Sequence, residues 1–285
     1  MNAPATSETH IGTIDGEKLA YTTVGDPSNP PLLFIHGWIS YRGVWQATLD
    51  ALKANYYGIA LDLLGHGDSD KPADGDYSIE AQAKRVLKLA DRLGVQRFGL
   101  VGHSMGGQIS LTIASLLAPD RVTKLVDING VVSGHLTERS ETTMSLLRVI
   151  ERFPVILPLT RPFTRFRPVA NLAYGKTAFY DMRRIPETFW RAESQRLYSH
   201  PKPQIFLRCT DAIQKLDLTP HLSKITAPTL ILFGKQDNTV PLSEGQLAHE
   251  RIANSQLLIL DECGHFTMIE QPAAYLNALQ QFLLP

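Results

Sequence analysis

The chain has 285 residues, of which 44% are hydrophobic and 20% are charged, a composition typical of a folded globular protein rather than a disordered one. Lys and Arg together number 28, as do Asp and Glu. The resulting net charge of zero argues against a nucleic-acid-binding protein, which needs a basic excess. Two cysteines, Cys209 and Cys263, are too few for a disulfide scaffold or an all-cysteine zinc site.

The first ten residues contain neither a basic stretch nor an apolar core, so they do not resemble a secretory signal. No window of about 18 residues is continuously apolar and uncharged, as a membrane-spanning helix requires. We therefore expect a cytoplasmic protein without stable membrane insertion.

Short strands follow one another along the chain. Two alternating runs joined by Asp15-Gly16 predict a hairpin from Ile11 to Val24. Later runs that are apolar on both faces predict buried parallel strands. They are Pro31 to Ile35, Tyr57 to Leu61, Phe98 to Val101, Leu125 to Ile128, Thr229 to Phe233 and Leu257 to Leu260.

Helical patterns lie between and after these strands, at Ile79 to Leu93, Met105 to Leu117 and Ala273 to Leu284. The alternation predicts an α/β fold, with a mostly parallel central sheet flanked by helices on both faces. Residues 131–220 interrupt it, with 8 of the 18 prolines and 14 Lys and Arg against 8 Asp and Glu. We expect this stretch to be a helical cap, or lid, inserted after the sixth strand over the carboxyl ends of the sheet. Residues 1–130 and 221–285 would form the core domain.

The strongest chemical signal is the sequence G-H-S-M-G at residues 102–106, which matches G-x-S-x-G. It follows an apolar strand and opens an apolar helix, the context that a nucleophile elbow requires. The two glycines allow a sharp turn and a close approach of helix and strand. We interpret Ser104 as a nucleophile in a strained backbone conformation with an exposed hydroxyl. The alternative is a helix that merely starts with small residues.

A serine hydroxyl needs a base, and the base needs a carboxylate that holds its tautomer. His265 follows Gly264 just after the last apolar run and is the candidate base; the alternative is a structural loop histidine. Asp237 follows the strand Thr229 to Phe233 and is the candidate acid, because an acid on a loop beyond its strand can reach the imidazole. Asp127, near the end of the preceding strand, is the competitor.

Negative charge on a former carbonyl oxygen needs two backbone N–H donors. Met105, the residue after the nucleophile, supplies one. The loop after Ile35 supplies the other, which we assign to Trp38. The alternative for Trp38 is an aromatic side chain packed at a domain boundary, and both roles are compatible because only its backbone is recruited.

With these motifs the chain resembles the α/β-hydrolase superfamily, in its branch of capped serine carboxylesterases, from the first hairpin to the last helix. Residues 62–70, D-L-L-G-H-G-D-S-D, resemble the D-x-x-G-x-G-x-S segment of these enzymes, which we interpret as structural. Ser104 stands where dehalogenases and epoxide hydrolases of this fold have aspartate, which disfavours both. His103 and Phe266 stand where carbon–carbon bond hydrolases often have Asn and Trp, which weakens that alternative. Lactonases and perhydrolases share the same pattern.

The resemblance implies a serine esterase that cleaves small to medium acyl esters, with Ser104, Asp237 and His265 as its catalytic residues. Trp38, His103 and Phe266 are the expected substrate-binding residues. No cofactor or metal is implied; His249-Glu250, for example, lacks the second histidine of a zinc motif. The expected partner is a small ester substrate, and the alternative from another class is a ligand receptor without turnover.

The expected acyl pocket combines Trp38 with part of the apolar set in the cap. That set is Met144, Leu146, Leu147, Ile150, Phe153, Ile156 and Leu157. The cap's basic excess has two interpretations, a solvated surface or an arginine that meets a carboxylate on the substrate. Candidates for the second are Arg148, Arg152 and Arg184.

Overall fold

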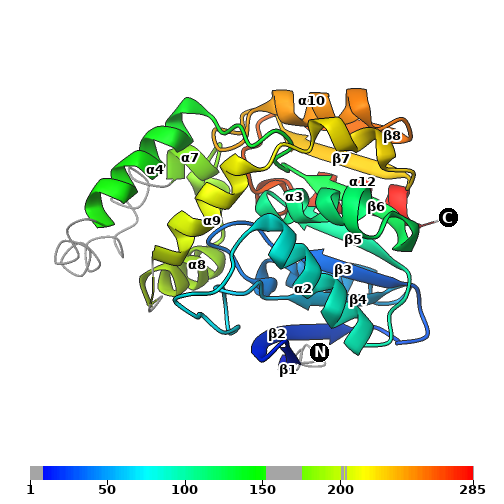
Figure 1. Ribbon diagram of the computed structural model, residues 1–285. Coiled ribbons are helices and arrows are strands. Elements are labelled where there is room, and N and C mark those ends of the chain that lie inside the picture. The colour runs from blue at the N-terminus through cyan, green and yellow to red at the C-terminus, as the bar shows by residue number, and fades with distance from the viewer. Residues whose placement is uncertain (1–8, 152–174, 200–201, 203, 285) are drawn as a thin grey trace.

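A computed structural model describes residues 9–151, 175–199, 202 and 204–284. Its centre is an eight-stranded sheet of order β1-β2-β4-β3-β5-β6-β7-β8 (Figure 1). The pairs β1–β2 and β2–β4 are antiparallel, and all other neighbouring strands pair in parallel. The strands are β1 (Thr9–Ile14), β2 (Glu17–Val24), β3 (Pro31–Ile35), β4 (Tyr57–Leu61), β5 (Phe98–His103), β6 (Val122–Ile128), β7 (Thr229–Gly234) and β8 (Ser255–Leu260). The predicted α/β fold is confirmed, and β6 begins three residues before the predicted strand. The prediction of a buried strand is wrong for β8, because it lies at the edge of the sheet and its Leu258 and Ile259 are 36% and 39% exposed.

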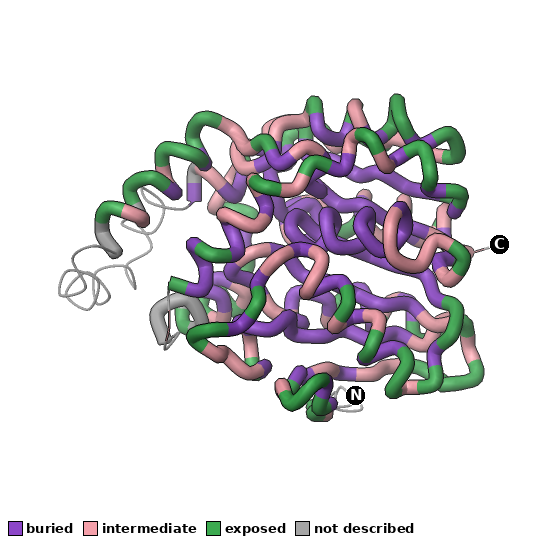
Figure 2. The backbone as a smooth tube through the Cα atoms, in the orientation of Figure 1, coloured by how far each residue is buried: buried purple, intermediate pink, exposed green. Residues whose placement is uncertain are grey.

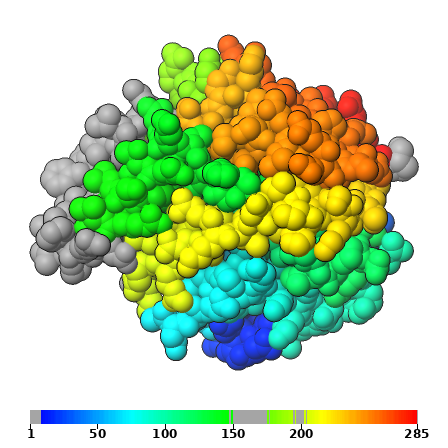
Figure 3. Space-filling view, turned by 45° about the horizontal axis from the view of Figure 1, so that its top comes forward, coloured from blue at the N-terminus to red at the C-terminus, as the bar shows by residue number. Residues whose placement is uncertain are grey.

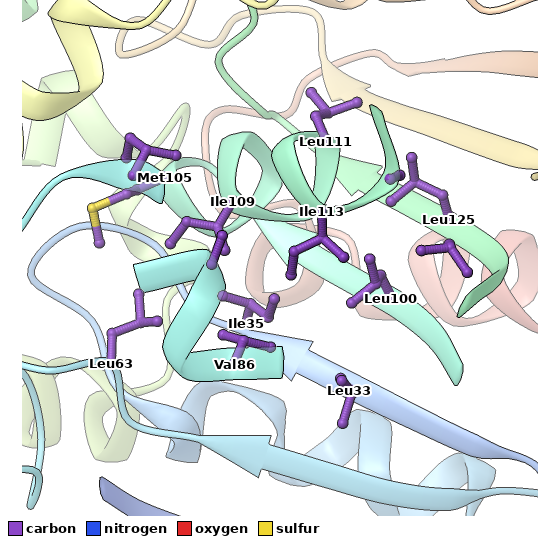
Figure 4. Packing of buried hydrophobic residues seen from close by; sticks show 14 of the residues in the cluster. Leu33, Ile35, Leu63, Val86, Leu100, Met105, Ile109, Leu111, Ile113 and Leu125 are labelled. Atoms are coloured by element: carbon purple, nitrogen blue, oxygen red, sulfur yellow. The ribbon is translucent and has the colours of Figure 1, made fainter. Parts of the chain in front are cut away.

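Helices cover both faces of the sheet, because its parallel strands are apolar on both sides. Side chains alternate along β3, so that Leu33 and Ile35 join one core cluster while Leu32 and Phe34 join the other. Residues of α2 (Ile79–Arg92) and α3 (Met105–Thr112) pack in the first cluster (Figure 4). Residues of α1 (Gln46–Leu52) and α12 (Pro272–Leu283) pack in the second. The central strands and α3 are the most continuously buried part of the chain (Figure 2).

Helices alternate with loops in the described part of the chain between β6 and β7. It contains α4 (Glu138–Glu151), α7 (Lys176–Ala178), α8 (Glu187–Ser199) and α9 (Gln204–Lys215). These helices lie at one end of the sheet (Figure 1), and α4 and α9 lie side by side on the surface in Figure 3. The extent of a separate cap over residues 131–220 stays a prediction. None of the helices within the described ranges is long and apolar enough to cross a membrane.

After β7 the chain forms α10 (Leu242–Arg251), and after β8 it forms the short helix α11 (Thr267–Glu270). The segment after β4 is held by a buried ion pair, since the Asp62 carboxylate accepts from the Arg42 guanidinium and from the Arg42 backbone N–H. Asp62 also accepts from the backbone N–H of Asp68 at 2.8 Å. The structural interpretation of residues 62–70 fits these contacts.

Asp127 lies in β6 with its side chain buried against two glycines. A Cβ atom on Gly107 or on Gly130 would lie 2.3 Å or 1.8 Å from its Oδ1. Within the described residues, no group hydrogen-bonds to either carboxyl oxygen. Burial and the nearby charge of Glu244 raise the pKa of Asp127 to about 7. This carboxyl group is therefore expected to be protonated below neutral pH.

Replacement of Asp127 by Asn should make the free energy of unfolding depend less on pH than it does in the wild type. The pKa of Asp127 in the folded state lies above its ordinary value of 3.8, so the folded protein keeps this proton while the unfolded chain releases it. The free energy of unfolding therefore falls as pH rises from about 4 to about 7, by at most about 1.4 kcal/mol per pH unit. An amide mimics the protonated acid at every pH. Urea unfolding of both proteins at about pH 5 and pH 7.5 measures the difference, and equal pH dependence would contradict a buried, protonated Asp127.

Candidate active site

Ser104 lies between β5 and α3 in the strained backbone conformation that the sequence predicts, with φ 56° and ψ −118°. The flanking glycines are required sterically. A Cβ atom on Gly102 would lie 2.3 Å from the Gly106 carbonyl oxygen, and one on Gly106 would lie 2.1 Å from the carbonyl oxygen of Ile35. The Ser104 residue as a whole is only 5% exposed, and the exposure of its hydroxyl group stays a prediction. The Gly37 loop lies directly against it, since a Cβ on Gly37 would be 3.0 Å from the Ser104 Cβ.

Backbone groups on both sides of Ser104 are arranged by the helix start. The Ser104 N–H donates to the Ile128 carbonyl at 2.9 Å, and its carbonyl accepts from the Gln108 N–H at 3.1 Å. Met105 is the first residue of α3, so its N–H is among the amides that the helix cannot satisfy internally. That amide stands beside Ser104 at the positive end of the helix dipole.

The loop after β3 is held by the imidazole of His36. Its Nε2 accepts from the Leu63 N–H at 3.0 Å, so Nδ1 carries the proton and donates to the Gly37 carbonyl at 2.7 Å. No peptide bond within the described residues is cis, so the Trp38 N–H points opposite to that carbonyl, away from the imidazole. His36 thus stabilises this turn and fixes the orientation of the candidate oxyanion donor.

The indole of Trp38 is part of a contact between the core and α9. Its Nε1 donates to the Phe206 carbonyl at 2.7 Å, and the two rings meet edge to face at 6.4 Å. The alternative role given to Trp38 above, packing at a boundary, is therefore seen in the structure.

Asp237 and His265 form a buried pair. The Asp237 Oδ2 accepts from His265 Nδ1 at 2.7 Å, which leaves the lone pair on Nε2. The other carboxylate oxygen, Asp237 Oδ1, accepts from the backbone N–H groups of Thr239 and Val240 at 2.7 Å and 3.0 Å. Asp127, the competitor, points instead at Gly107 and Gly130. The geometry brings Asp237 to the imidazole and leaves Asp127 elsewhere.

Asn129 is a residue of this site that sequence reasoning missed. Its Nδ2 donates to the Asp237 Oδ2 at 2.8 Å, so that oxygen is held by both the amide and the imidazole. Asn129 has a positive φ of 49° at the end of β6, and its N–H donates to the Leu232 carbonyl. The available signal was Asn-Gly directly after a buried strand, where a positive φ is common.

The backbone of His265 is fixed on both sides. Its N–H donates to the Ala178 carbonyl at 3.0 Å, and its carbonyl accepts from His103 Nε2 at 2.8 Å. The rings of His103 and His265 are 4.7 Å apart, and His103 directly precedes Ser104. Burial and the neighbouring His265 hold the pKa of His103 well below its ordinary value, so His103 stays neutral.

Phe266 packs in an aromatic cluster beside these histidines. Its ring lies 4.8 Å from that of His103, stacks on Phe179 at 5.1 Å and meets Phe189 at 5.9 Å. Phe266 and His103 are both buried, so their predicted contact with substrate stays a prediction. Within the described ranges, no three His, Cys, Asp or Glu side chains converge so as to hold a metal ion.

Only part of the apolar set that is expected to line the acyl pocket falls within the described residues. Phe153, Ile156 and Leu157 lie outside the described residues, as do the side chains of Leu147 and Ile150. Met144 is buried and accepts a hydrogen bond from Thr210 of α9 at its sulfur. Leu146 lies on the outer face of α4 and is 59% exposed. This member of the set therefore does not line a buried pocket.

The arginines proposed to meet an anionic substrate have partners within the chain. Arg148 pairs with Asp211 at 2.6 Å, and Arg184 pairs with Glu262 at 2.7 Å. Arg152 lies outside the described residues. Because the side chains of both pairs are partly exposed, the described part of the insertion favours the interpretation of its basic excess as a solvated surface.

Comparison with known proteins identifies the relatives of this chain. A family model described as alpha/beta hydrolase fold matches residues 30–272. The uncharacterized hydrolase YugF of Bacillus subtilis (strain 168) is 32% identical over 276 residues, covering 95% of this chain and 96% of YugF. The monoacylglycerol lipase abhd6-A of Xenopus laevis is 27% identical over 287 residues, covering 93% of this chain and 79% of that protein. Among solved structures, a bacterial membrane phospholipase A has a TM-score of 0.80 and 28% identity, with 97% of this chain and 86% of that chain covered.

The match includes the parts of the chain that build the site. Residues 30–272 contain the His36 loop, the Ser104 turn, Asp237 and His265. The sheet order and the strained turn between β5 and α3 agree with this assignment. The chain belongs to the α/β-hydrolase family.

Proposed function

We propose that this protein is a serine esterase that hydrolyses neutral carboxylic esters through an acyl-enzyme on Ser104. The observation that carries the proposal is the buried bond from His265 Nδ1 to Asp237, next to a serine in a strained strand-to-helix turn. A hydrolase is also what the family match and the relatives support.

In the proposed mechanism, Ser104 Oγ attacks the acyl carbon while His265 Nε2 takes its proton. Asp237 keeps the ring in the tautomer that has a free Nε2 and stabilises the imidazolium. The Trp38 and Met105 amides bind the developing oxyanion. His265 then returns the proton to the leaving alcohol, and a water activated by the same imidazole releases the acid.

A neutral substrate is favoured by the charges around the site. The described candidates for binding a substrate carboxylate, Arg148 and Arg184, are paired with acids of this chain. The first relatives are named monoacylglycerol lipases, and a monoacylglycerol is a neutral ester. We infer an uncharged ester with an apolar acyl chain as the substrate class. A panel that includes lactones and a vinylogous diketone tests the other chemistries of this triad.

Replacement of Ser104 by Ala should lower kcat by about 10⁶, as in other serine triads, because only oxyanion and binding contributions are left. A fluorophosphonate should add its mass to the tryptic peptide that carries Ser104 in the wild type. Turnover of a chromogenic butyrate ester and mass spectrometry measure the two effects. Labelling of another residue, or turnover that survives in the variant, would refute Ser104 as the nucleophile. Wild-type turnover that is as low as that of the variant would favour a receptor.

Replacement of Asp237 by Asn should lower kcat by about 10⁴, because the amide favours the wrong imidazole tautomer. Asp127→Asn is the matched control, since it makes the same change in a carboxyl group that lies away from His265. It should leave kcat nearly unchanged and act on stability. Steady-state kinetics of both variants decide, and the reverse pattern would show that the acid was assigned to the wrong strand.

A neutral butyrate ester should have a higher kcat/KM than its hemisuccinate analogue at low and at high salt. The reason is that Arg148 and Arg184, the described candidates for binding a carboxylate, are already paired with acids of the chain. Measurements at about 20 mM and 500 mM salt test this, because steering of an anion weakens as salt rises. A preference for the hemisuccinate that shrinks with salt would establish a cationic substrate site.

A further inference from the structure

Glu270, the last residue of α11, is a buried carboxylate with an unusual set of partners. It is 6% exposed, and its hydrogen-bond donors in the described structure are backbone amides. Its Oε1 accepts from the Gly264 N–H at 2.9 Å. Its Oε2 accepts from the N–H groups of Tyr180 and Asp181, at 2.8 Å and 3.3 Å. One side chain therefore joins two segments that are about 80 residues apart in sequence.

Both segments hold the candidate base. Gly264 directly precedes His265, and residues 180–181 follow Ala178, whose carbonyl accepts the His265 N–H at 3.0 Å. The same part of the insertion also reaches the loop of Asp237, because Thr239 Oγ1 donates to the Thr177 carbonyl at 3.0 Å. Glu270 thus supports the two segments that fix His265, and its hydrogen-bond partners in the described structure do not include Ser104.

The packing around this bridge leaves little room for adjustment. A Cβ atom on Gly264 would lie 2.7 Å from the Tyr180 nitrogen and 2.8 Å from Glu270 Oε1. Burial raises the pKa of Glu270, while the three backbone N–H donors oppose that rise. The three N–H donors are shared between the two oxygens, an arrangement that matches a carboxylate with an acceptor on each side.

We propose that Glu270 is a positioning residue for His265, which it places by tying the His265 loop to residues 178–181. The inference rests on the proposed function, because the position of the imidazole matters only if His265 is the base for Ser104. It assigns to residues 178–181 of the insertion a part in holding the base, in addition to any contact with substrate.

Glu270→Gln tests the bridge with a change of one atom. A glutamine must turn its NH2 group toward either Gly264 or Tyr180, and both present an N–H donor, so one side of the bridge is broken in either orientation. Glu262→Gln is the matched control. Glu262 lies on the same loop and also pairs with the insertion, through Arg184, but its side chain is 59% exposed. Loss of an exposed ion pair has little effect.

The readouts are the second-order rate of fluorophosphonate labelling at Ser104, the kcat and KM for the preferred ester, and the melting temperature. We expect Glu270→Gln to lower both the labelling rate and kcat by about 10- to 100-fold, because a small misplacement of a reacting group has effects of this size. KM should stay within about twofold, since the contacts with substrate are unchanged. Glu262→Gln should match the wild type in labelling rate, kcat and KM.

A merely structural role would lower the melting temperature of Glu270→Gln and leave the folded enzyme with wild-type labelling rate and kcat, which would overturn the inference. If Glu270→Gln does not fold, Glu270→Asp decides by the same criteria, because it keeps the charge and shortens the reach of the carboxylate. Failure of the wild type to be labelled at Ser104 would overturn the proposed function, and this inference with it. Labelling of the wild type and equal labelling of a folded Glu270 variant would overturn the inference alone.

Discussion

The parallel register of five adjacent strands determines where every candidate residue of the site lies. Ile35 of β3 pairs with Gly102 of β5, and Gly102 pairs with Asp127 of β6. Asp127 pairs with Ile231 of β7, which in turn pairs with Leu257 of β8. Because these residues form one row, the loops beyond them emerge together at one edge of the sheet. The close contact between Gly106 and the Ile35 carbonyl then holds α3 against β3 and fixes the turn at Ser104.

Within that edge, hydrogen bonds from distant segments fix the candidate base. The side chain of His265 is oriented by Asp237, its N–H by Ala178 and its carbonyl by His103. Asp237 is itself held by Asn129. A group fixed at its side chain and on both sides of its backbone has few orientations to lose before reaction, which is the advantage of a preorganised site.

The sequence was informative where the signal is local. Apolar runs located the parallel strands, and G-x-S-x-G in its strand–helix context predicted the strained Ser104. Asp127 could also have been set aside from local pattern, because residues two apart share a face of a strand and Leu125 belongs to the core cluster beneath α3. Its side chain therefore points into the sheet–helix interface and away from the loop edge.

Contacts between distant segments could not be predicted in this way. Asn129 and Glu270 act through partners far along the chain, and no spacing in the sequence relates Glu270 to Tyr180 or Asn129 to Asp237. The low exposed fraction of the whole Ser104 residue could not be predicted either, since the loop that lies against it follows another strand. Periodicity indicates which face of an element is apolar, whereas the partner of a polar side chain depends on tertiary structure.

The two imidazoles beside Ser104 show how the surroundings separate chemically identical groups. His103 is buried and donates to a carbonyl oxygen, and its depressed pKa keeps it neutral. His265 donates from Nδ1 to a carboxylate, which can balance a positive charge on the ring. In the proposed mechanism, a proton released by Ser104 is therefore stabilised on His265 and not on His103, although the rings are only 4.7 Å apart. The neutral histidine can then hold the His265 carbonyl without competing for that proton.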